Sequence, residues 1–380
     1  MLVNLLSPYE GLVLFRAEKI LYGRLERPHL VISTCRVNGG LREDITYVAN
    51  HQACEPKACP GERHGSCLAV RDPAAYHQRV CHYHQLPPEA TVLLGTAANM
   101  NLAGIGMEEF RALKVICLAT AGVETNAGRA GDPAQVYEWE GQFERLCPQA
   151  GTINLLLFIN QELTPAALVR SIKMATEAKT SVLQELNVPS RYSQGLATGT
   201  GTDQIAVAAL KTDRRPLSGA GKHVKLGELL ARATRKAIRR ALSFQNKLTP
   251  ETVRYVPRLL ERFGLGESGL LEALKERLSP KDFLLLERNH RSVLSDSILV
   301  AHTLAYVHLM DQLSWGVVPQ ESAPEIFLSQ AALVAASLSG KFSRYGLYLE
   351  SLEPWKEDPL CLFLQALALG FAEKWDVPYH

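Results

Sequence analysis

Polar side chains that could bind a ligand follow a largely apolar run near the middle of the chain. Residues 115–121 form the run, and glycines then alternate with polar residues that include Asn126, Arg129 and Asp132. Glycine lets a backbone approach a ligand closely, and the amide, guanidinium and carboxylate groups between the glycines can converge on one point. Loops that follow strands commonly carry binding residues in α/β proteins. The stretch therefore predicts a binding loop, with a polar surface loop as the alternative.

Threonines and a carboxylate form a second candidate cluster. Threonine and glycine alternate over residues 198–202 and are followed by Asp203. Such a segment offers backbone N–H groups and hydroxyls to an oxyanion or a phosphate, or simply forms a tight turn into the next strand. No Gly-Lys-Ser/Thr follows, which excludes a Walker loop. A strand predicted over residues 151–159 places Thr152 and Asn154 on the same side.

Charged groups on two predicted helices add further candidates. A Thr-Pro pair caps the start of a helix predicted over residues 164–186. Glu177 lies opposite the apolar stripe of this helix. This face is either solvated, or Thr176, Glu177, Lys179 and Thr180 look into a cleft. His223 precedes a basic helix, and it either titrates near neutral pH or lies on the surface.

Three cysteines and a histidine have the chemistry of a metal site. They are spaced Cys54-x4-Cys59-x7-Cys67, with His64 between the last two. Thiolates and imidazoles at this density are the ligands of zinc and iron–sulfur sites. The spacing contains no CxxC pair, so a reduced cysteine cluster in a loop is the alternative. The sequence indicates no other cofactor.

The composition excludes several classes of protein. The chain has 380 residues, a net charge of +2 and 47% hydrophobic residues, which is ordinary for a globular protein and gives no overall attraction to nucleic acid or membranes. Polar and charged residues interrupt every apolar segment before the ~20 residues that a membrane span needs, and the first residues lack a signal-peptide pattern. Eight cysteines in this context indicate thiols rather than disulfides. We therefore expect a cytoplasmic protein that binds no nucleic acid.

The elements that position these groups are strands and helices in the first two thirds of the chain. Apolar runs that predict strands occur before residue 48 and over residues 91–95, 115–121, 151–159 and 204–210. The sequence thus predicts an α/β domain over 1–246, with a mixed β-sheet core and packed helices. Helical periodicity without strand signals then predicts an all-helical domain over 247–380, of unknown role. Whether the sheet forms a single doubly wound layer or two stacked layers does not follow from the sequence.

The polar stretches belong to six motifs that occur in a fixed order. They occupy residues 120–123, 126–133, 151–154, 175–180, 197–203 and 221–228. In this order they resemble the adenosylcobinamide amidohydrolase family of corrinoid salvage, and residues 38–40, 50–52 and 96–98 fit the family as well. The resemblance covers roughly residues 10–245. The Cys54–Cys67 segment looks like an insertion, and the region after 246 lies outside the resemblance.

The resemblance implies an activity and a substrate. Members hydrolyse the amide that links aminopropanol to a corrin-ring propionate in adenosylcobinamide. The products are adenosylcobyric acid and 1-amino-2-propanol, so that incomplete corrinoids re-enter coenzyme B12 synthesis. The alternative is a corrinoid-binding or delivery protein without catalytic activity. The intact polar motifs disfavour this alternative, because binding a mostly apolar macrocycle would not require all of them.

Amide hydrolysis needs a nucleophile, a stabilised oxyanion and a proton for the leaving amine. The sequence contains no GxSxG elbow and no HExxH helix, so serine-hydrolase and zinc-protease templates do not fit. We expect the Thr152 hydroxyl or a water molecule to attack, activated by Glu177, Asp203 or His223. The Gly151-Thr152 pair is also similar to the cleavage site of hydrolases that cut their own chain before a nucleophilic threonine.

The remaining candidates bind substrate or metal. We expect the substrate to contact Asn99, Asn126, Arg129, Asp132, Asn154, Lys179 and Thr200, of which Asn126 or Asn154 would face the oxyanion. A metal-activated water is a second mechanism, with ligands from Cys54, Cys59, Cys67 and His64.

Overall fold

The computed structural model describes residues 3–53, 68–134, 136–140, 142–145 and 151–375. The chain forms two compact units, Met1–Thr249 and Pro250–His380. They are called the α/β unit and the helical unit below, and each is described by itself.

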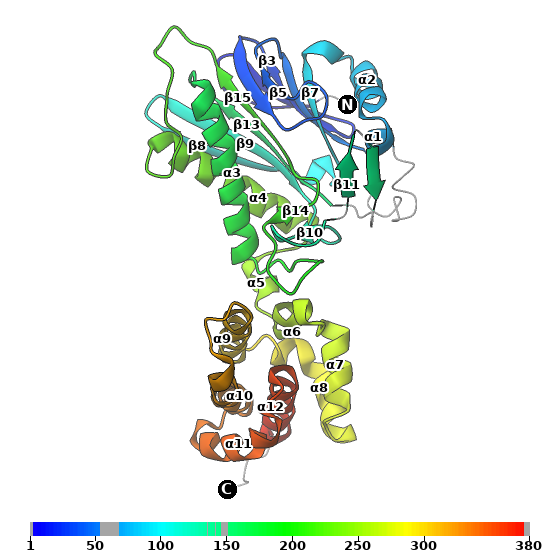
Figure 1. The fold of residues 1–380 in the computed structure, drawn as a ribbon, viewed down its shortest axis with the longest axis vertical. Helices are drawn as coiled ribbons and strands as arrows, with labels where there is room; N and C mark the ends of the chain where they lie inside the picture. Colours follow the sequence, from blue (N-terminus) through cyan, green and yellow to red (C-terminus); the bar gives the residue numbers. More distant parts are fainter. Residues whose placement is uncertain (1–2, 54–67, 135, 141, 146–150, 376–380) are drawn as a thin grey trace. The chain divides into compact units, whose positions relative to one another are not determined.

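The α/β unit contains two mixed β-sheets (Figure 1). The five-stranded sheet has the order β1 (Val3–Tyr9), β2 (Leu12–Ala17), β3 (Ile20–Leu25), β6 (Tyr47–Gln52) and β7 (Thr91–Thr96). The six-stranded sheet has the order β5 (Gly40–Arg42), β4 (His29–Ser33), β15 (Gln204–Leu210), β13 (Ile153–Ile159), β9 (Leu113–Ala121) and β8 (Gly104–Phe110). Only β6–β7 and β13–β15 are parallel pairs within these two sheets. The prediction of a mixed sheet is therefore confirmed.

The two sheets stack face to face, which is the layering that the sequence left open. One apolar cluster draws on both sheets and includes Leu14, Leu94, Leu118 and Phe158. All seven residues of β13 are buried, which explains why this strand reads as a continuous apolar run and not as an alternating pattern. Burial of two sheet faces against each other gives the unit its main core.

Helices cover the outer faces of both sheets. Helix α2 (Pro73–His84) packs on the five-stranded sheet through Val80 and Cys81. Helices α3 (Pro165–Glu185) and α4 (Lys225–Gln245) lie on the six-stranded sheet (Figure 1). Strand β8 and α4 approach so closely that a Cβ added at Gly104 would lie 1.9 Å from the Ala237 carbonyl oxygen. The unit thus has four layers, in the order helix, sheet, sheet, helices.

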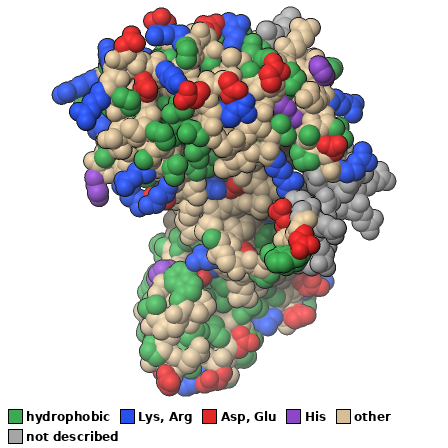
Figure 2. All heavy atoms as spheres, turned by 45° about the horizontal axis from the view of Figure 1, so that its top comes forward, with side chains coloured by type: hydrophobic (Ala, Val, Ile, Leu, Met, Phe, Trp, Pro, Cys, Tyr) green, Lys and Arg blue, Asp and Glu red, His purple; other side chains and the backbone are tan. Residues whose placement is uncertain are grey.

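The basic side chains of α4 are largely paired with carboxylates. Arg235 and Arg239 bind Glu185 of α3, and Lys236 binds Glu108 of β8. Figure 2 shows acidic and basic side chains mixed over the visible face of the molecule. The basic residues of this helix therefore form ion pairs that attach it to α3 and β8.

The helical unit contains helices and no strand among its described residues (Figure 1). Its helices are α5 (Pro250–Val253), α6 (Val256–Leu260), α7 (Glu267–Lys275), α8 (Pro280–Val293), α9 (Ser297–Ser314), α10 (Ala323–Ser339), α11 (Tyr345–Leu352) and α12 (Pro359–Glu373). Tyr306 is buried against two aromatic rings, tilted relative to Phe327 and edge-to-face with Phe363. Over the described ranges, no single helix is long and apolar enough to cross a membrane. Helices α8 and α9, bent by 87°, pass that test only as a pair.

Candidate functional site

The candidate site lies where β9 ends and where β13 and β15 begin. These ends meet because β13 runs parallel to β15 and antiparallel to β9. In this register Asn154 is paired with Gln204 on one side and with Thr120 on the other. The loops after β9 and before β13 and β15 therefore meet at one end of the sheet, although they are far apart in the sequence.

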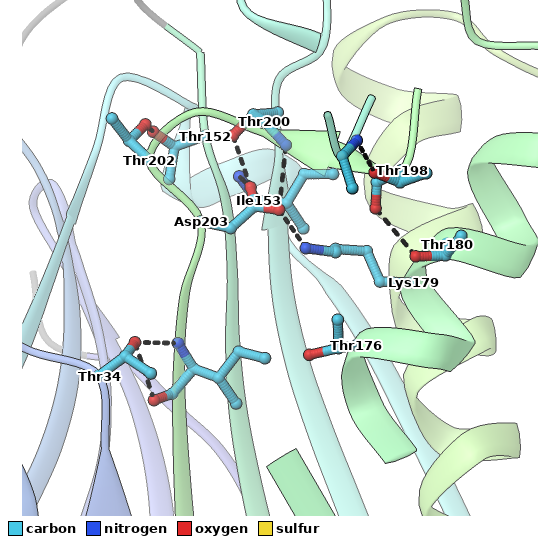
Figure 3. A network of polar contacts seen from close by, with 12 residues as sticks. Thr34, Thr152, Ile153, Thr176, Lys179, Thr180, Thr198, Thr200, Thr202 and Asp203 are labelled. Carbon is cyan, nitrogen blue, oxygen red and sulfur yellow. Dashed lines mark hydrogen bonds and ion pairs between the residues drawn. The ribbon is translucent and has the colours of Figure 1, made fainter. Parts of the chain in front are cut away.

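Asp203 organises this end of the sheet (Figure 3). One carboxylate oxygen accepts hydrogen bonds from the Ile153 N–H, at 2.9 Å, and from the Thr200 hydroxyl, at 2.5 Å. The other oxygen accepts the Thr200 N–H, at 3.1 Å, and forms an ion pair with Lys179 of α3. The two charged side chains are only 7% and 12% exposed. With four donors on its two oxygens, Asp203 holds its neighbours in position.

Two threonine hydroxyls meet beside this ion pair. The Oγ1 atoms of Thr152 and Thr202 are 2.5 Å apart (Figure 3). The Thr202 hydroxyl also lies 2.9 Å from the Gly151 carbonyl oxygen. If Thr202 donates to that carbonyl, then Thr152 donates to Thr202. Among the described residues, no carboxylate or imidazole is hydrogen-bonded to Thr152. Thr152 is buried, with 6% of its surface exposed, whereas its partner Thr202 is exposed.

Asn126 is buried, and both the nitrogen and the oxygen of its side-chain amide form hydrogen bonds. Its Nδ2 donates to the Gly151 carbonyl oxygen at 2.9 Å, and its Oδ1 accepts the Tyr192 hydroxyl at 2.6 Å. Tyr192 and Thr202 were not among the residues predicted from the sequence. Thr202 belongs to the threonine–glycine motif and could have been chosen on that ground, whereas nothing in the sequence around Tyr192 marks it.

Arg129 and Asp132 connect two loops. The Asp132 carboxylate accepts the Arg129 N–H at 2.6 Å and the Ser190 hydroxyl at 2.5 Å. Burial by itself would raise the pKa of Asp132, but the hydrogen bonds from Ser190, Ser193 and the Arg129 N–H lower it. The Arg129 guanidinium donates to the Leu196 carbonyl at 3.3 Å. The short strands β10 (Ala127–Gly128) and β14 (Gly199–Thr200) pair beside these contacts, so the structure uses Arg129 and Asp132 to hold the loops together.

Asn154 lies inside the unit, between the two sheets. It is 0% exposed, and its Nδ2 donates to Asn50 Oδ1 at 2.8 Å and to the Gly95 carbonyl at 3.0 Å. Asn50 in turn donates to the Thr120 hydroxyl at 2.8 Å. The predicted contact between Asn154 and substrate therefore does not fit this conformation, because the side chain points into the core instead of towards the surface.

Glu177 and His223 do not join the Asp203 cluster. Glu177 is two residues from Lys179, which places the two side chains ~160° apart around α3. Its carboxylate lies 3.0 Å from the Lys222 ammonium and 3.5 Å from that of Lys173, and the hydrogen bond from Lys222 lowers its pKa. His223 is exposed in the turn before α4. Neither residue is bonded to Thr152 within the part of the chain that the structure describes.

Asn99 lines an open pocket of about 400 Å³ at the ends of β6 and β7. Arg16 near the end of β2, Glu18 and Lys19 in the turn between β2 and β3, Gln52 at the end of β6, and Asn101 also line it. Arg16 and Lys19 were not predicted from the sequence, because charged residues at a strand end and in a hairpin turn resemble any solvated hairpin. The pocket offers amide and cationic groups to a ligand.

The predicted metal ligands Cys54, Cys59, Cys67 and His64 lie outside the described residues. Within the described residues, no group of three or more His, Cys, Asp or Glu side chains could hold a metal ion. Zinc or an iron–sulfur cluster stays a prediction, which elemental analysis and activity before and after chelation would test. His77 and Cys81 pair on α2 at 3.7 Å, and burial raises the pKa of Cys81 to about 11, which makes it a packing residue.

Comparison with known proteins gives three findings. A family model described as adenosylcobinamide amidohydrolase matches residues 6–250. An uncharacterized protein of Methanocaldococcus jannaschii is 33% identical over 216 residues, which cover 54% of this chain and 80% of that protein. A crystal structure of a protein from Pyrococcus horikoshii OT3 matches with a TM-score of 0.32 and 13% identity, over 64% of this chain and 83% of that one. That structural likeness is too low to support an argument.

Proposed function

The chain belongs to the adenosylcobinamide amidohydrolase family, and from this premise we propose that it hydrolyses the aminopropanol amide of adenosylcobinamide. The products are adenosylcobyric acid and 1-amino-2-propanol, which returns incomplete corrinoids to cobalamin synthesis. One observation carries the proposal. Within the family-matched residues, two hydrogen-bonded groups lie side by side at the strand ends. One joins Asn126, the Gly151 carbonyl, Thr202 and Thr152, and the other joins Asp203, Lys179 and the Ile153 N–H, the next residue along the chain.

In the proposed reaction, the Thr152 hydroxyl oxygen attacks the carbonyl carbon of the propionamide. The carbon–nitrogen bond breaks, the nitrogen takes up a proton and leaves as 1-amino-2-propanol, and an ester to Thr152 remains. Water hydrolyses the ester and restores the hydroxyl. Lys179 and Asp203 fix the turn that carries Thr202, which is the hydrogen-bond partner of Thr152. A water molecule oriented by the two hydroxyls is the alternative nucleophile.

The pocket beside Asn99 suits part of the substrate. Carboxamides at the edge of the corrin ring both donate and accept hydrogen bonds, as do the side chains of Gln52, Asn99 and Asn101. A pocket of about 400 Å³ holds only a portion of a macrocycle. We therefore propose that it binds the ring substituents and leaves the aminopropanol arm free to reach Thr152.

The direct test is to incubate the purified protein with adenosylcobinamide and to quantify 1-amino-2-propanol by mass spectrometry. We expect release by the wild-type chain and a loss of at least about 10²-fold in Thr152→Ala. Thr152→Ser, which keeps a hydroxyl, should retain turnover. Thr176→Ala is the matched control, because this exposed threonine on α3 donates to the Ile172 carbonyl of its own helix and, within the described part of the chain, is not hydrogen-bonded to the Asp203 cluster.

Two further outcomes separate the alternatives. Hydroxylamine added during turnover traps a Thr152 ester as a corrinoid hydroxamate, whereas direct attack by water gives none. A wild-type chain that binds adenosylcobinamide without releasing aminopropanol would reject the hydrolase and favour a corrinoid-binding protein.

A further inference from the structure

The peptide before Thr152 occupies a pair of donors that could stabilise an oxyanion. The Gly151 carbonyl oxygen accepts from Asn126 Nδ2 and lies within hydrogen-bond distance of Thr202 Oγ1, each at 2.9 Å. Two side-chain donors that converge on one carbonyl oxygen are the arrangement that stabilises a tetrahedral oxyanion. The residue that follows this carbonyl is Thr152, whose hydroxyl lies 2.5 Å from Thr202 Oγ1.

Hydrogen bonds also hold the residues that follow this peptide. After it, the Ile153 N–H donates to Asp203 at 2.9 Å, and the Thr152 carbonyl accepts the Gly122 N–H at 3.1 Å. Gly151 itself has φ +149°, a conformation that is almost restricted to glycine. A Cβ at this position would lie 2.9 Å from the Asn126 Cβ. The Gly151–Thr152 peptide is thus fixed in place, with a hydroxyl and two donors beside it.

We propose that the chain cuts itself between Gly151 and Thr152. The Thr152 hydroxyl oxygen bonds to the Gly151 carbonyl carbon, and the carbon–nitrogen bond between the two residues breaks. The hydroxyl proton passes to the departing nitrogen, so this step converts an amide into an ester and an amine. Water then hydrolyses the ester, which restores the Thr152 hydroxyl and leaves a carboxylate on Gly151.

The cut has a catalytic consequence that rests on the proposed function. It frees Asn126 and Thr202 from the Gly151 carbonyl, so that both can donate to the oxyanion of a substrate. It also gives Thr152 a free α-amino group, whose pKa is normally about 7.7 to 8.0. This amine is a base next to the hydroxyl, and a base is what Thr152 lacks among its described hydrogen-bond partners. Threonine hydrolases that use their own N-terminal amine follow this chemistry.

The experiment is an intact-mass measurement of the purified full-length chain, directly after purification and after prolonged incubation. We expect two fragments, of residues 1–151 and 152–380, whose summed mass exceeds that of the uncut chain by one water. Thr152→Val should stay as one chain, and Thr152→Ser should still be cut. Thr176→Val, the matched control on α3, should be cut like the wild type.

A second variant keeps the test valid if Thr152→Val does not fold. Thr202→Val removes one donor to the Gly151 carbonyl from an exposed position, and it should slow the cut by about 10² to 10³-fold. Circular dichroism and thermal unfolding of both valine variants show whether they fold. A folded Thr202→Val chain that is cut at the wild-type rate would contradict the proposed role of this donor pair and with it the inference.

The outcomes for the two proposals are distinct. A wild-type chain that remains uncut, or is cut at another bond, overturns the self-cleavage, whether or not it releases aminopropanol. A chain that is cut before Thr152 but releases no aminopropanol supports the self-cleavage and rejects the proposed hydrolase. Release of aminopropanol by an uncut chain supports the proposed hydrolase activity and rejects the self-cleavage.

Discussion

Each of the two units contains a nearly buried ion pair, and the surroundings of the two pairs differ. In the helical unit, both guanidinium nitrogens of Arg262 bind the two oxygens of Asp311, and the side chains are 4% and 14% exposed. In the α/β unit, Lys179 binds one oxygen of Asp203, and the side chains are 7% and 12% exposed. Burial and charge are therefore similar in the two places.

The neighbours of the carboxylates make the difference. Asp311 binds Arg262 through both carboxylate oxygens. This bidentate ion pair links α9 to the short helix η4 (Glu261–Phe263). Asp203 divides its oxygens between a lysine, a hydroxyl and two backbone N–H groups at the start of two strands. A buried ion pair between helices fixes packing, whereas one at strand ends also fixes the loops that carry reactive groups. The two ion pairs therefore differ in their neighbours and not in their charge or burial.

The largest effect is expected from Lys179→Met. Without the ammonium group, Asp203 is left with an uncompensated charge and the turn that holds Thr202 shifts. A displacement of about 1 Å at a reacting group lowers turnover by about 10²-fold, and we expect at least that loss of aminopropanol release. Lys173→Met is the matched control, since Lys173 is on the same helix with its side chain 75% exposed. Equal turnover in both variants would contradict a special role for the Lys179–Asp203 pair.

The matching change in the helical unit is Arg262→Met. Removal of one partner from a buried pair typically destabilises a protein by about 3 to 5 kcal/mol, so we expect a clear loss of stability in this unit. Denaturant unfolding, followed by hydrogen exchange of peptides from each unit, measures it. Aminopropanol release at a temperature where the variant is folded should stay within about twofold of wild type. A loss of turnover comparable to that of Lys179→Met would remove the distinction between the two pairs.

Acidification should weaken the α/β unit between pH 6.5 and about 4. Burial lowers the pKa of His29 and of His51 to about 4 each. Between that value and the ordinary histidine pKa, the unfolded chain binds protons that the folded unit does not, so the free energy of unfolding falls as the pH falls. Denaturant unfolding at a series of pH values measures the slope. A double variant with Asn at both positions should show a shallower slope, and an unchanged slope would assign the effect to other groups.

A smaller effect is expected from Asn99→Ala at the pocket of the α/β unit. One side-chain hydrogen bond contributes about 1 kcal/mol, so we expect an increase of about fivefold in KM for adenosylcobinamide with little change in kcat. Asn289→Ala is the control in the helical unit, where this exposed amide bonds only to the Leu285 carbonyl one turn earlier. A drop in kcat at constant KM would argue that the pocket does not bind substrate.

The smallest effect is expected from removal of the helical unit. The family model ends at residue 250, and the polar cluster around Asp203 lies wholly within Met1–Thr249. We therefore expect a chain truncated after Thr249 to keep aminopropanol release within about twofold. The measurement compares kcat and KM of the truncated and full-length chains at equal concentration. A strong loss in a folded, truncated chain would assign a role in catalysis to the helical unit.

Much of the fold could be predicted because local patterns determine it. The apolar run before Asn160 predicts β13, and the Thr164-Pro165 pair predicts the start of α3 at the observed position. The loss of strand signals after residue 246 likewise predicts the helices that follow. The sequence also indicated that Asn126, Thr152 and Asp203 belong to one set, since all three follow or precede strands.

Tertiary structure decided which of these side chains meet. Periodicity alone leaves Glu177 and Lys179 as equal candidates, and only the packing of α3 on the sheet turns Lys179 towards Asp203. Alternation places Asn154 on one side of its strand, but the second sheet makes that side the interior. The pairing of β9 with β13 brings Asn126 to the Gly151 carbonyl. Contacts between distant residues depend on strand register and on layer stacking, which no local pattern encodes, and the chemistry of the site is made of such contacts.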